Sequence, residues 1–317
     1  EPDPEGWDGK ASETAPRLID GVYQISSPAE LKWFAEKAAE YPDIEGILTE
    51  DVDLNNRPWE PIGGDTAETA FLGVFDGNGK GIRNLYIQSR NQAGLFAYNG
   101  GEIRNVTIEG LILNSDNAGA VASCNSGKIT NVASGVKIRG GNRIAGITAL
   151  NKGGTVEGCT NTEIVSGGQY VGGITAVNEG TVTFSKNIGM ITADSSFAAG
   201  IAADNDGGIV KDCANSGHVV SRAALRLSFV GGLVGRNNGT AKNLYNTGNV
   251  VCLGRSVGGC VGINTTGSTA CDLYNAGDVL GSYVDTEDGE EFRVGGAVGE
   301  MNDGVSEAYY LKSLSIS

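Results

Sequence analysis

The sequence predicts an all-β solenoid, a right-handed parallel β-helix with three strands per coil and an N-terminal capping helix. One phrase, clearest at 232–250, recurs along the chain at spacings of 21 to 38 residues. Such a period indicates stacked units that bury their apolar faces against their neighbours. The first Asn of the phrase aligns at Asn78, Asn99, Asn125, Asn151, Asn178, Asn205, Asn237 and Asn264, with a looser ninth copy at Asn302.

Composition agrees with a turn-rich repeat and excludes several classes of partner. Gly accounts for 50 of 317 residues, without a collagen-like period, so the glycines are interpreted as turns. The formal net charge of −15 argues against nucleic acid, because no basic stripe is evident, and against anionic membrane surfaces. No apolar run approaches the ~18 residues of a membrane span. The chain starts at Glu1 without Met, as expected of a trimmed or mature fragment.

The first 72 residues predict an arm and a cap. Residues 1–17 are polar and Pro-rich and are interpreted as a linker or arm. A short strand is expected at 23–26, followed by a helix over 28–40 that starts behind Ser27-Pro28. Alternating residues predict a further strand over 44–54. We interpret 18–72 as a cap, since an open stack of parallel strands leaves an unpaired edge that a helix can cover.

Residues 73–317 predict about nine coils. An apolar column, a column of small residues and the Asn column follow each other at spacings of two, so all three are expected to point inward. A second Asn-x-Gly corner appears at Asn187, Asn215, Asn246 and Asn275, and a Gly-Gly pair marks a third corner. Asn tolerates the left-handed backbone of a corner, and its amide stacks in ladders. A structural ladder is therefore favoured over ligand or sugar contacts for these Asn residues.

The repeat resembles a known family. The segment 230–239, with Val-Gly-Gly-Leu-Val-Gly-Arg-Asn-Asn-Gly, and the segment 243–250, with Asn-Leu-Tyr-Asn-Thr-Gly-Asn-Val, are similar to the GLUG repeat of large bacterial surface proteins. GLUG repeats also occur in non-catalytic regions of some IgA-cleaving metallopeptidases. The match covers roughly 20–312 and departs from the pattern at Asn161-Thr-Glu and in the first two coils. The resemblance implies an extracellular or cell-surface protein and carries over no catalytic residue.

Catalytic motifs are sparse. There is no His-Glu-x-x-His motif, and His218 is the single His, interpreted as an outward corner residue. The six Cys are interpreted as buried small hydrophobes rather than a disulfide framework. Parallel β-helices also host polysaccharide lyases and hydrolases, which use clustered carboxylates. The candidates for such a site are Asp194, Asp204, Asp206 and Asp212, with Lys186 and Lys211. Asp204 and Asp206 flank a structural Asn and are expected to face outward as solvated charges.

Two coils are longer than the rest. Ordinary coils need 6 or 7 positions from the second-Asn Val to the residue before Gly-Gly, whereas 219–230 takes 11 and 279–294 takes 15. Both insertions fall at the same corner, two coils apart, and insertions on one face of a repeat protein often mark its binding face. The alternative is that corners tolerate insertion cheaply. The candidate binding residues are Arg222, Arg226, Tyr283, Asp285, Glu287, Asp288 and Glu290.

The expected function is adhesion or binding of a host glycan or surface protein by a non-enzymatic, extracellular bacterial module. The alternatives are a carbohydrate-active β-helix enzyme and a purely structural stalk. No cofactor is expected, although Ca²⁺ held by 285–291 through hard oxygen ligands is an open alternative. The strand-like end at 309–317 has no cap, so we expect the native chain to continue or that edge to be covered.

Overall fold

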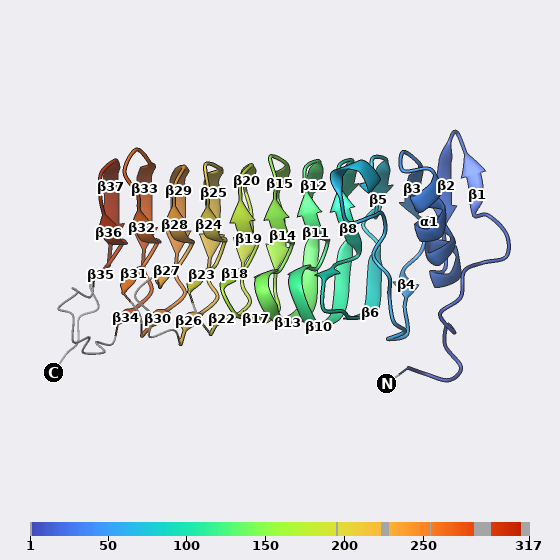
Figure 1. The fold of residues 1–317 in the computed structure, drawn as a ribbon, viewed down its shortest axis with the longest axis horizontal. Helices are drawn as coiled ribbons and strands as arrows, with labels where there is room; N and C mark the ends of the chain where they lie inside the picture. The colour runs from blue at the N-terminus through green and yellow to red at the C-terminus, as the bar shows by residue number, and fades with distance from the viewer. Residues whose placement is uncertain (1, 195, 223–227, 254, 282–292, 312–317) are drawn as a thin grey trace.

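The computed structural model describes residues 2–194, 196–222, 228–253, 255–281 and 293–311. In Figure 1 the coils stack side by side along a rod, with helix α1 at the N-terminal end and the last coil at the other. Neighbouring coils pair through parallel strands in register along the rod, for example β19 with β24 and β24 with β28. The predicted parallel β-solenoid is confirmed.

The N-terminal end is covered by a helix and a hairpin. Strands β1 (Arg17–Ile19) and β2 (Val22–Ile25) pair antiparallel, and helix α1 (Pro28–Glu40) follows with the predicted bounds. The Ser27 side chain accepts a hydrogen bond from the Glu30 amide at 3.3 Å, which satisfies one free donor of the first turn. The ring of Phe34 packs 5.9 Å from the ring of Phe75, so the helix seals the aromatic start of the core.

The strand predicted over 44–54 is interrupted. It forms β3 (Glu45–Leu48) and β4 (Val52–Asp53), which pair with β5 (Val74–Asp76) and β6 (Gly81–Gln88) respectively. A short 3₁₀ helix, η1 (Ala67–Thr69), lies between β4 and β5 in the chain. Parallel stacking of strands therefore begins within the segment 18–72. The N-terminal arm packs on this first layer, where the Asn55 amide donates to the backbone oxygens of Asp3 and Trp7.

The strands fall into rows that run along the rod. The row ending at the first Asn is β8 (Phe96–Asn99), β11 (Ala122–Asn125), β14 (Thr148–Asn151), β19 (Thr175–Asn178), β24 (Ala202–Asn205), β28 (Val234–Asn237), β32 (Val261–Asn264) and β36 (Val298–Met301). The next row follows the first Asn corner, and two of its coils contribute two short strands instead of one. Its strands are β9 (Glu102–Arg104), β12 (Lys128–Thr130), β15 (Thr155–Glu157), β16 (Thr160–Asn161), β20 (Thr181–Thr183), β21 (Lys186–Asn187), β25 (Ile209–Asn215), β29 (Thr240–Asn246), β33 (Thr269–Asn275) and β37 (Val305–Tyr310).

Two further rows complete each coil. One is β17 (Val165–Gly167), β22 (Ile191–Ala193), β26 (Val219–Ser221), β30 (Val250–Cys252) and β34 (Val279–Gly281). The other is β7 (Gln92–Ala93), β18 (Tyr170–Gly172), β23 (Phe197–Ala199), β27 (Phe229–Gly231), β31 (Ser256–Gly258) and β35 (Arg293–Gly295). In the early coils, β10 (Thr107–Gly119) and β13 (Ala133–Ala145) run continuously through several rows.

Three strands per coil is the wrong number. The coil from β28 to β31 has four strands, and the coil from β19 to β23 has five. The additional break in the second case lies at Phe184, whose φ of +50° turns the chain between β20 and β21. Residues with φ between +53° and +64° occupy neighbouring positions of other coils, at Asn131, Gly158 and Asp212. Most residues in register at this corner are Asn or Asp, namely Asn105, Asn131, Asp212, Asn243 and Asp272. Both residue types suit a left-handed backbone, so this column was a signal that our prediction did not use.

The Asn ladder is confirmed from Asn99 to Asn264. Each amide donates to the Oδ1 of the next Asn, for example Asn151 to Asn178 and Asn178 to Asn205, both at 2.8 Å. A second ladder runs from Asn161 through Asn187, Asn215 and Asn246 to Asn275. All members of both ladders are buried.

Two predicted members do not belong to the ladder. Asn78 is exposed, has φ of +51° and donates to the Leu48 oxygen, because the turn between β5 and β6 uses Asn for its left-handed backbone. Asn302 is exposed as well, because the register of the last coil places Met301 opposite Asn264.

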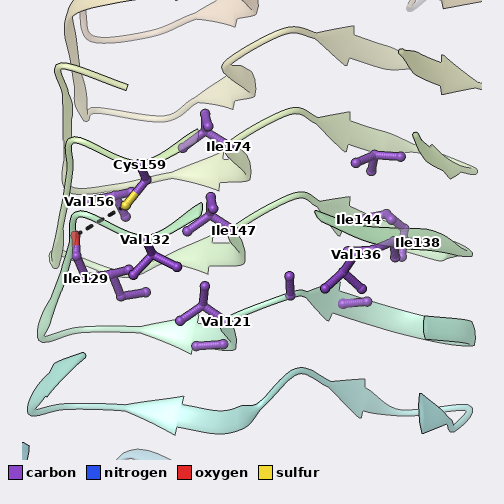
Figure 2. Close-up of a cluster of buried hydrophobic side chains, with 14 of the residues drawn as sticks. Val121, Ile129, Val132, Val136, Ile138, Ile144, Ile147, Val156, Cys159 and Ile174 are labelled. Carbon is purple, nitrogen blue, oxygen red and sulfur yellow. Dashed lines mark hydrogen bonds between the residues drawn. The ribbon is translucent and has the colours of Figure 1, made fainter. Parts of the chain in front are cut away.

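The core lies inside the stack. Figure 2 shows the aliphatic side chains of successive coils lying over one another, with Val121, Ile147 and Ile174 from one column and Ile129 and Val156 from another. These side chains are fully buried. The predicted apolar column consists of Val74, Leu95, Val121, Ile147, Ile174, Ile201, Leu233, Cys260 and Ala297. It is confirmed from Leu95 onwards, whereas Val74 lies on β5 and pairs with Glu102 of β9.

Candidate functional site

The two insertions lie at one corner of the solenoid. The first follows β26 and the second follows β34, and both strands pair with β30 between them. The strands that end the insertions, β27 and β35, pair in the same way with β31. Because neighbouring strands lie about 4.8 Å apart, the two insertions leave the rod roughly 10 Å from each other. We call this place the inserted corner.

Most of the predicted binding residues lie outside the described residues. These are Arg226, Tyr283, Asp285, Glu287, Asp288 and Glu290, together with the whole predicted Ca²⁺ segment. Arg222 is described and exposed, with its guanidinium 3.9 Å from Asp194 Oδ1. Both side chains are more than half exposed, so this ion pair contributes little to stability.

Two rows of side chains flank the Gly-Gly corner and meet across it. We call them the corner rows. The first row is Gln92, Asn117, Arg143, Tyr170, Phe197, Phe229, Ser256 and Arg293, in register from coil to coil. The second is Tyr98, Cys124, Leu150, Val177, Asp204, Arg236, Ile263 and Glu300. The inserted corner leads directly into the first row at Phe229 and Arg293.

The middle of the corner rows is aromatic. The rings of Tyr170 and Phe197 stack with centroids 4.8 Å apart and an interplanar angle of 4°, and Phe229 follows 5.5 Å further on. Phe197, Phe229 and Ile263 are buried together outside the main core. This stack ties three successive coils together along the corner.

Beside the aromatic stack lies an ion pair between the buried Asp204 and the partly exposed Arg236. The Arg236 guanidinium donates to both carboxylate oxygens of Asp204 at 2.8 and 2.6 Å and lies 5.7 Å from the centre of the Phe197 ring. Burial raises the pKa of Asp204, against the opposing effect of Arg236. The prediction that Asp204 faces solvent is wrong, because the residue before the ladder Asn belongs to the corner rows.

A second charged group closes the rows near the C-terminal end. Glu300 is 6% exposed, accepts a hydrogen bond from Ser256 Oγ at 2.8 Å and pairs with the guanidinium of Arg293. Arg255 also lies 3.7 Å from this carboxylate. Arg293 directly follows the second insertion, so that insertion ends on a fixed charge cluster.

The acidic candidates for catalysis are dispersed among separate partners. Asp206 is exposed on the turn and accepts from Asn238, and Asp212 accepts from the Asn243 amide at another corner. Asp194 pairs with Arg222. Lys211 pairs with its neighbour Asp212, and Lys186 is exposed on β21. The structure therefore does not bring the four aspartates together at one place.

The remaining reactive side chains have structural roles or face solvent. All six cysteines are free, and burial raises the pKa values of Cys159, Cys213 and Cys260 to about 12. His218 is exposed at a corner, as predicted. Within the described part of the chain, no group of three His, Cys, Asp or Glu is arranged to hold a metal ion.

The fold and these rows define an elongated β-solenoid repeat module. Over 93% of the chain, the structure is similar to a crystal structure from Bacteroides ovatus described as a "putative immunoglobulin A1 protease". The TM-score is 0.61, the identity is 15%, and 87% of that chain is covered. At this identity the likeness concerns the fold alone.

A curated relative shares part of the sequence. Halomucin from Haloquadratum walsbyi is 31% identical over 141 residues, which is 40% of this chain. The match spans only 2% of halomucin's own length. No protein-family model matches the chain, so the resemblance to the GLUG repeat stays a prediction. Among the described residues, no helix is long and apolar enough to cross a membrane.

Proposed function

We propose that the chain is a non-enzymatic module of a bacterial cell-surface or secreted protein that binds a host glycan or surface protein at its inserted corner. One observation carries this proposal. The strands that bound the two longest connections, β26 and β27 in one coil and β34 and β35 in another, pair in register with β30 and β31 of the unextended coil between them. Loops raised from one edge of a rigid repeat scaffold are the usual way such proteins present a binding surface.

The surroundings of this corner support binding rather than catalysis. Asp204 is held by Arg236, and Glu300 is held by Ser256 and Arg293, so both buried carboxylates already have strong partners. A glycosidase needs two carboxyl groups about 5 to 10 Å apart that face the substrate. The corner rows instead give the loops a stiff base, as preorganised binding sites require.

Shortening both insertions tests the proposal. Each is replaced by residues 194–196, the short connection between β22 and β23 of an ordinary coil. The control variant, Glu179→Gln with Asp206→Asn, removes two charges at a different corner. Wild type and both variants are compared on a host glycan array and on immobilised host surface proteins, with far-UV circular dichroism to verify folding.

We expect the loop-shortened variant to lose at least tenfold in affinity for the ligands that wild type binds, whereas the control keeps them. Undiminished binding by a folded loop-shortened variant contradicts the proposal. A wild-type chain that binds none of the probes favours the structural stalk. Cleavage of a polysaccharide by the wild type favours the enzyme.

A further inference from the structure

The acidic charge of the chain is not uniform. Residues 81–152 contain eight Lys and Arg against three Asp and Glu, a net charge of +5. Since the whole chain has a net charge of −15, the residues outside this segment have a net charge of −20. Most of these cations form no ion pair with a described carboxylate, namely Arg90, Lys128, Lys137, Arg139, Arg143 and Lys152. Residues 81–152 are therefore a basic segment, which we call the basic belt, within an otherwise acidic chain. The net charge of the whole chain conceals it. Unpaired cations in such a chain favour an anionic ligand.

A cavity opens between the corner rows within this belt. It measures about 200 Å³ and lies in the coils of β7, β8, β11 and β14. Its lining residue Arg143 is three strand pairings along the first corner row from Phe229, where the first insertion ends. Pockets for drug-sized ligands hold about 300 to 1,000 Å³, so this cavity suits one ring-sized group. Its lining residues are Asp65, Gln92, Tyr98, Asn117, Ser123, Cys124, Arg143, Leu150 and Lys152.

The lining combines an apolar surface with polar groups. Tyr98, Cys124 and Leu150 follow one another in register and pack together as a small apolar cluster. Ser123 donates to the Asn117 backbone oxygen at 3.3 Å and is 3% exposed. A sugar ring presents the same combination, because its C–H face is apolar and its hydroxyls form hydrogen bonds.

One buried acceptor at this cavity has no partner. Gln92 donates through its Nε2 to the Asp65 backbone oxygen at 3.1 Å, but its Oε1 is buried without a hydrogen bond from any described residue. A buried polar atom without a partner is costly and requires an explanation. A ligand hydroxyl placed in the cavity would supply the missing donor.

Two cations stand at the same cavity. Arg143 and Lys152 are both exposed, and the Arg143 guanidinium donates to Asn117 Oδ1 at 3.3 Å. This amide contact leaves most of the five guanidinium donors available to a carboxylate, which Arg binds in a bidentate manner. Asp65 is the one carboxylate among the lining residues, so the lining carries a net positive charge.

We infer that this cavity binds a uronate residue of an acidic polysaccharide. Arg143 and Lys152 pair with the sugar carboxylate, Gln92 Oε1 accepts from a hydroxyl, and the ring lies against Tyr98 and Leu150. A larger cavity of about 830 Å³ is lined in part by Arg90 and Asp116, which are close in the chain to Gln92 and Asn117 of the first cavity. Nucleic acid is disfavoured, because the cavity of about 200 Å³ holds one ring-sized group and the chain outside the basic belt is acidic.

Binding of trigalacturonate to the full chain tests the inference. Isothermal titration at low salt compares it with its methyl ester, which has the same rings without charge, and with a single-stranded oligonucleotide. The test variant is Arg143→Gln with Lys152→Gln. The matched control is Lys186→Gln, which removes an exposed cation on β21, away from the corner rows, and the loop-shortened variant described above is included.

We expect the acid to bind at least tenfold more tightly than its ester, and the double variant to lose at least tenfold in affinity. Lys186→Gln and the loop-shortened variant should stay within twofold of wild type, which separates this site from the inserted corner. Equal affinity for acid and ester, or full affinity in a folded double variant, overturns the inference. So does an oligonucleotide that binds more tightly than trigalacturonate, which would assign the basic belt to nucleic acid.

Discussion

Removing one amide from the middle of the Asn ladder should cost more than removing its first member. In Asn178→Ala, the Oδ1 of Asn205 loses its donor and the amide of Asn151 loses its acceptor, both at 2.8 Å. The Gly180 amide also loses its bond to Asn178 Oδ1 at 3.3 Å. Each buried group left without a partner costs about 1–3 kcal/mol. Because Asn151 keeps the Gly154 oxygen as an acceptor, we expect a total of about 2–5 kcal/mol.

The first ladder member provides an internal comparison. Asn99 Oδ1 already has no partner among the described residues, so Asn99→Ala orphans no amide donor of a preceding ladder Asn. It removes the donor of Asn125 Oδ1 and the longer bonds to the Gly101 and Lys128 oxygens. This change should cost about 1–3 kcal/mol. Asn78→Gly is the control outside the ladder, because Gly accepts the φ of +51° at that turn, and it should cost less than about 1 kcal/mol.

Urea unfolding followed by circular dichroism measures all three variants, with the slope of the transition checked against wild type. The expected order of destabilisation is Asn178→Ala, then Asn99→Ala, then Asn78→Gly. If Asn178→Ala unfolds within about 1 kcal/mol of wild type, or if Asn99→Ala costs as much, the ladder does not stabilise the rod as argued.

Three further predictions concern other parts of the rod. Cys271, the least buried thiol, should react first with iodoacetamide at pH 8, and Cys260, whose pKa is raised to about 12, should react only on unfolding, as mass spectrometry would show. Burial alone would raise the pKa of Asp76, but its hydrogen bonds hold that pKa below the ordinary 3.8, so its stabilisation is present at neutral pH and lost as pH falls through the folded value. Asp76→Asn should therefore flatten the fall in melting temperature below pH 4; an unchanged slope would count against it. Gly173→Ala should lower the melting temperature, because its Cβ would meet the Gly200 oxygen at 2.0 Å, and overpacking of this kind costs about 1–3 kcal/mol.

The parts of the fold that the sequence predicts are those where one physical requirement selects one residue type. A buried amide ladder accepts only side chains that both donate and accept, so Asn151, Asn178 and Asn205 recur visibly. The helix over 28–40 was predictable from Ser27, Pro28 and its apolar spacing. The prediction that Asn78 belongs to the ladder was wrong because Asn also suits a left-handed turn. The residue type alone does not distinguish a ladder position from a turn.

The corner rows escaped prediction because no residue type is shared along them. The residue type changes along the first row, from Arg143 through the stacked Tyr170 and Phe197 to Ser256, which contacts Glu300 across the corner. Position relative to the Gly-Gly pair is the one signal that could have found them. The cation pair of Arg143 and Lys152 was obscured for a related reason, since net charge averages over the whole rod.

Every amide in the two ladders donates in one direction, from each coil to the one that follows. The span from one ladder residue to the next is therefore a unit with identical connections at both ends. Copying or excising such a span in the gene leaves every remaining donor with an acceptor of the same kind. Length thus becomes a property that evolution can adjust one turn at a time, while the sites carried on particular turns keep their shape.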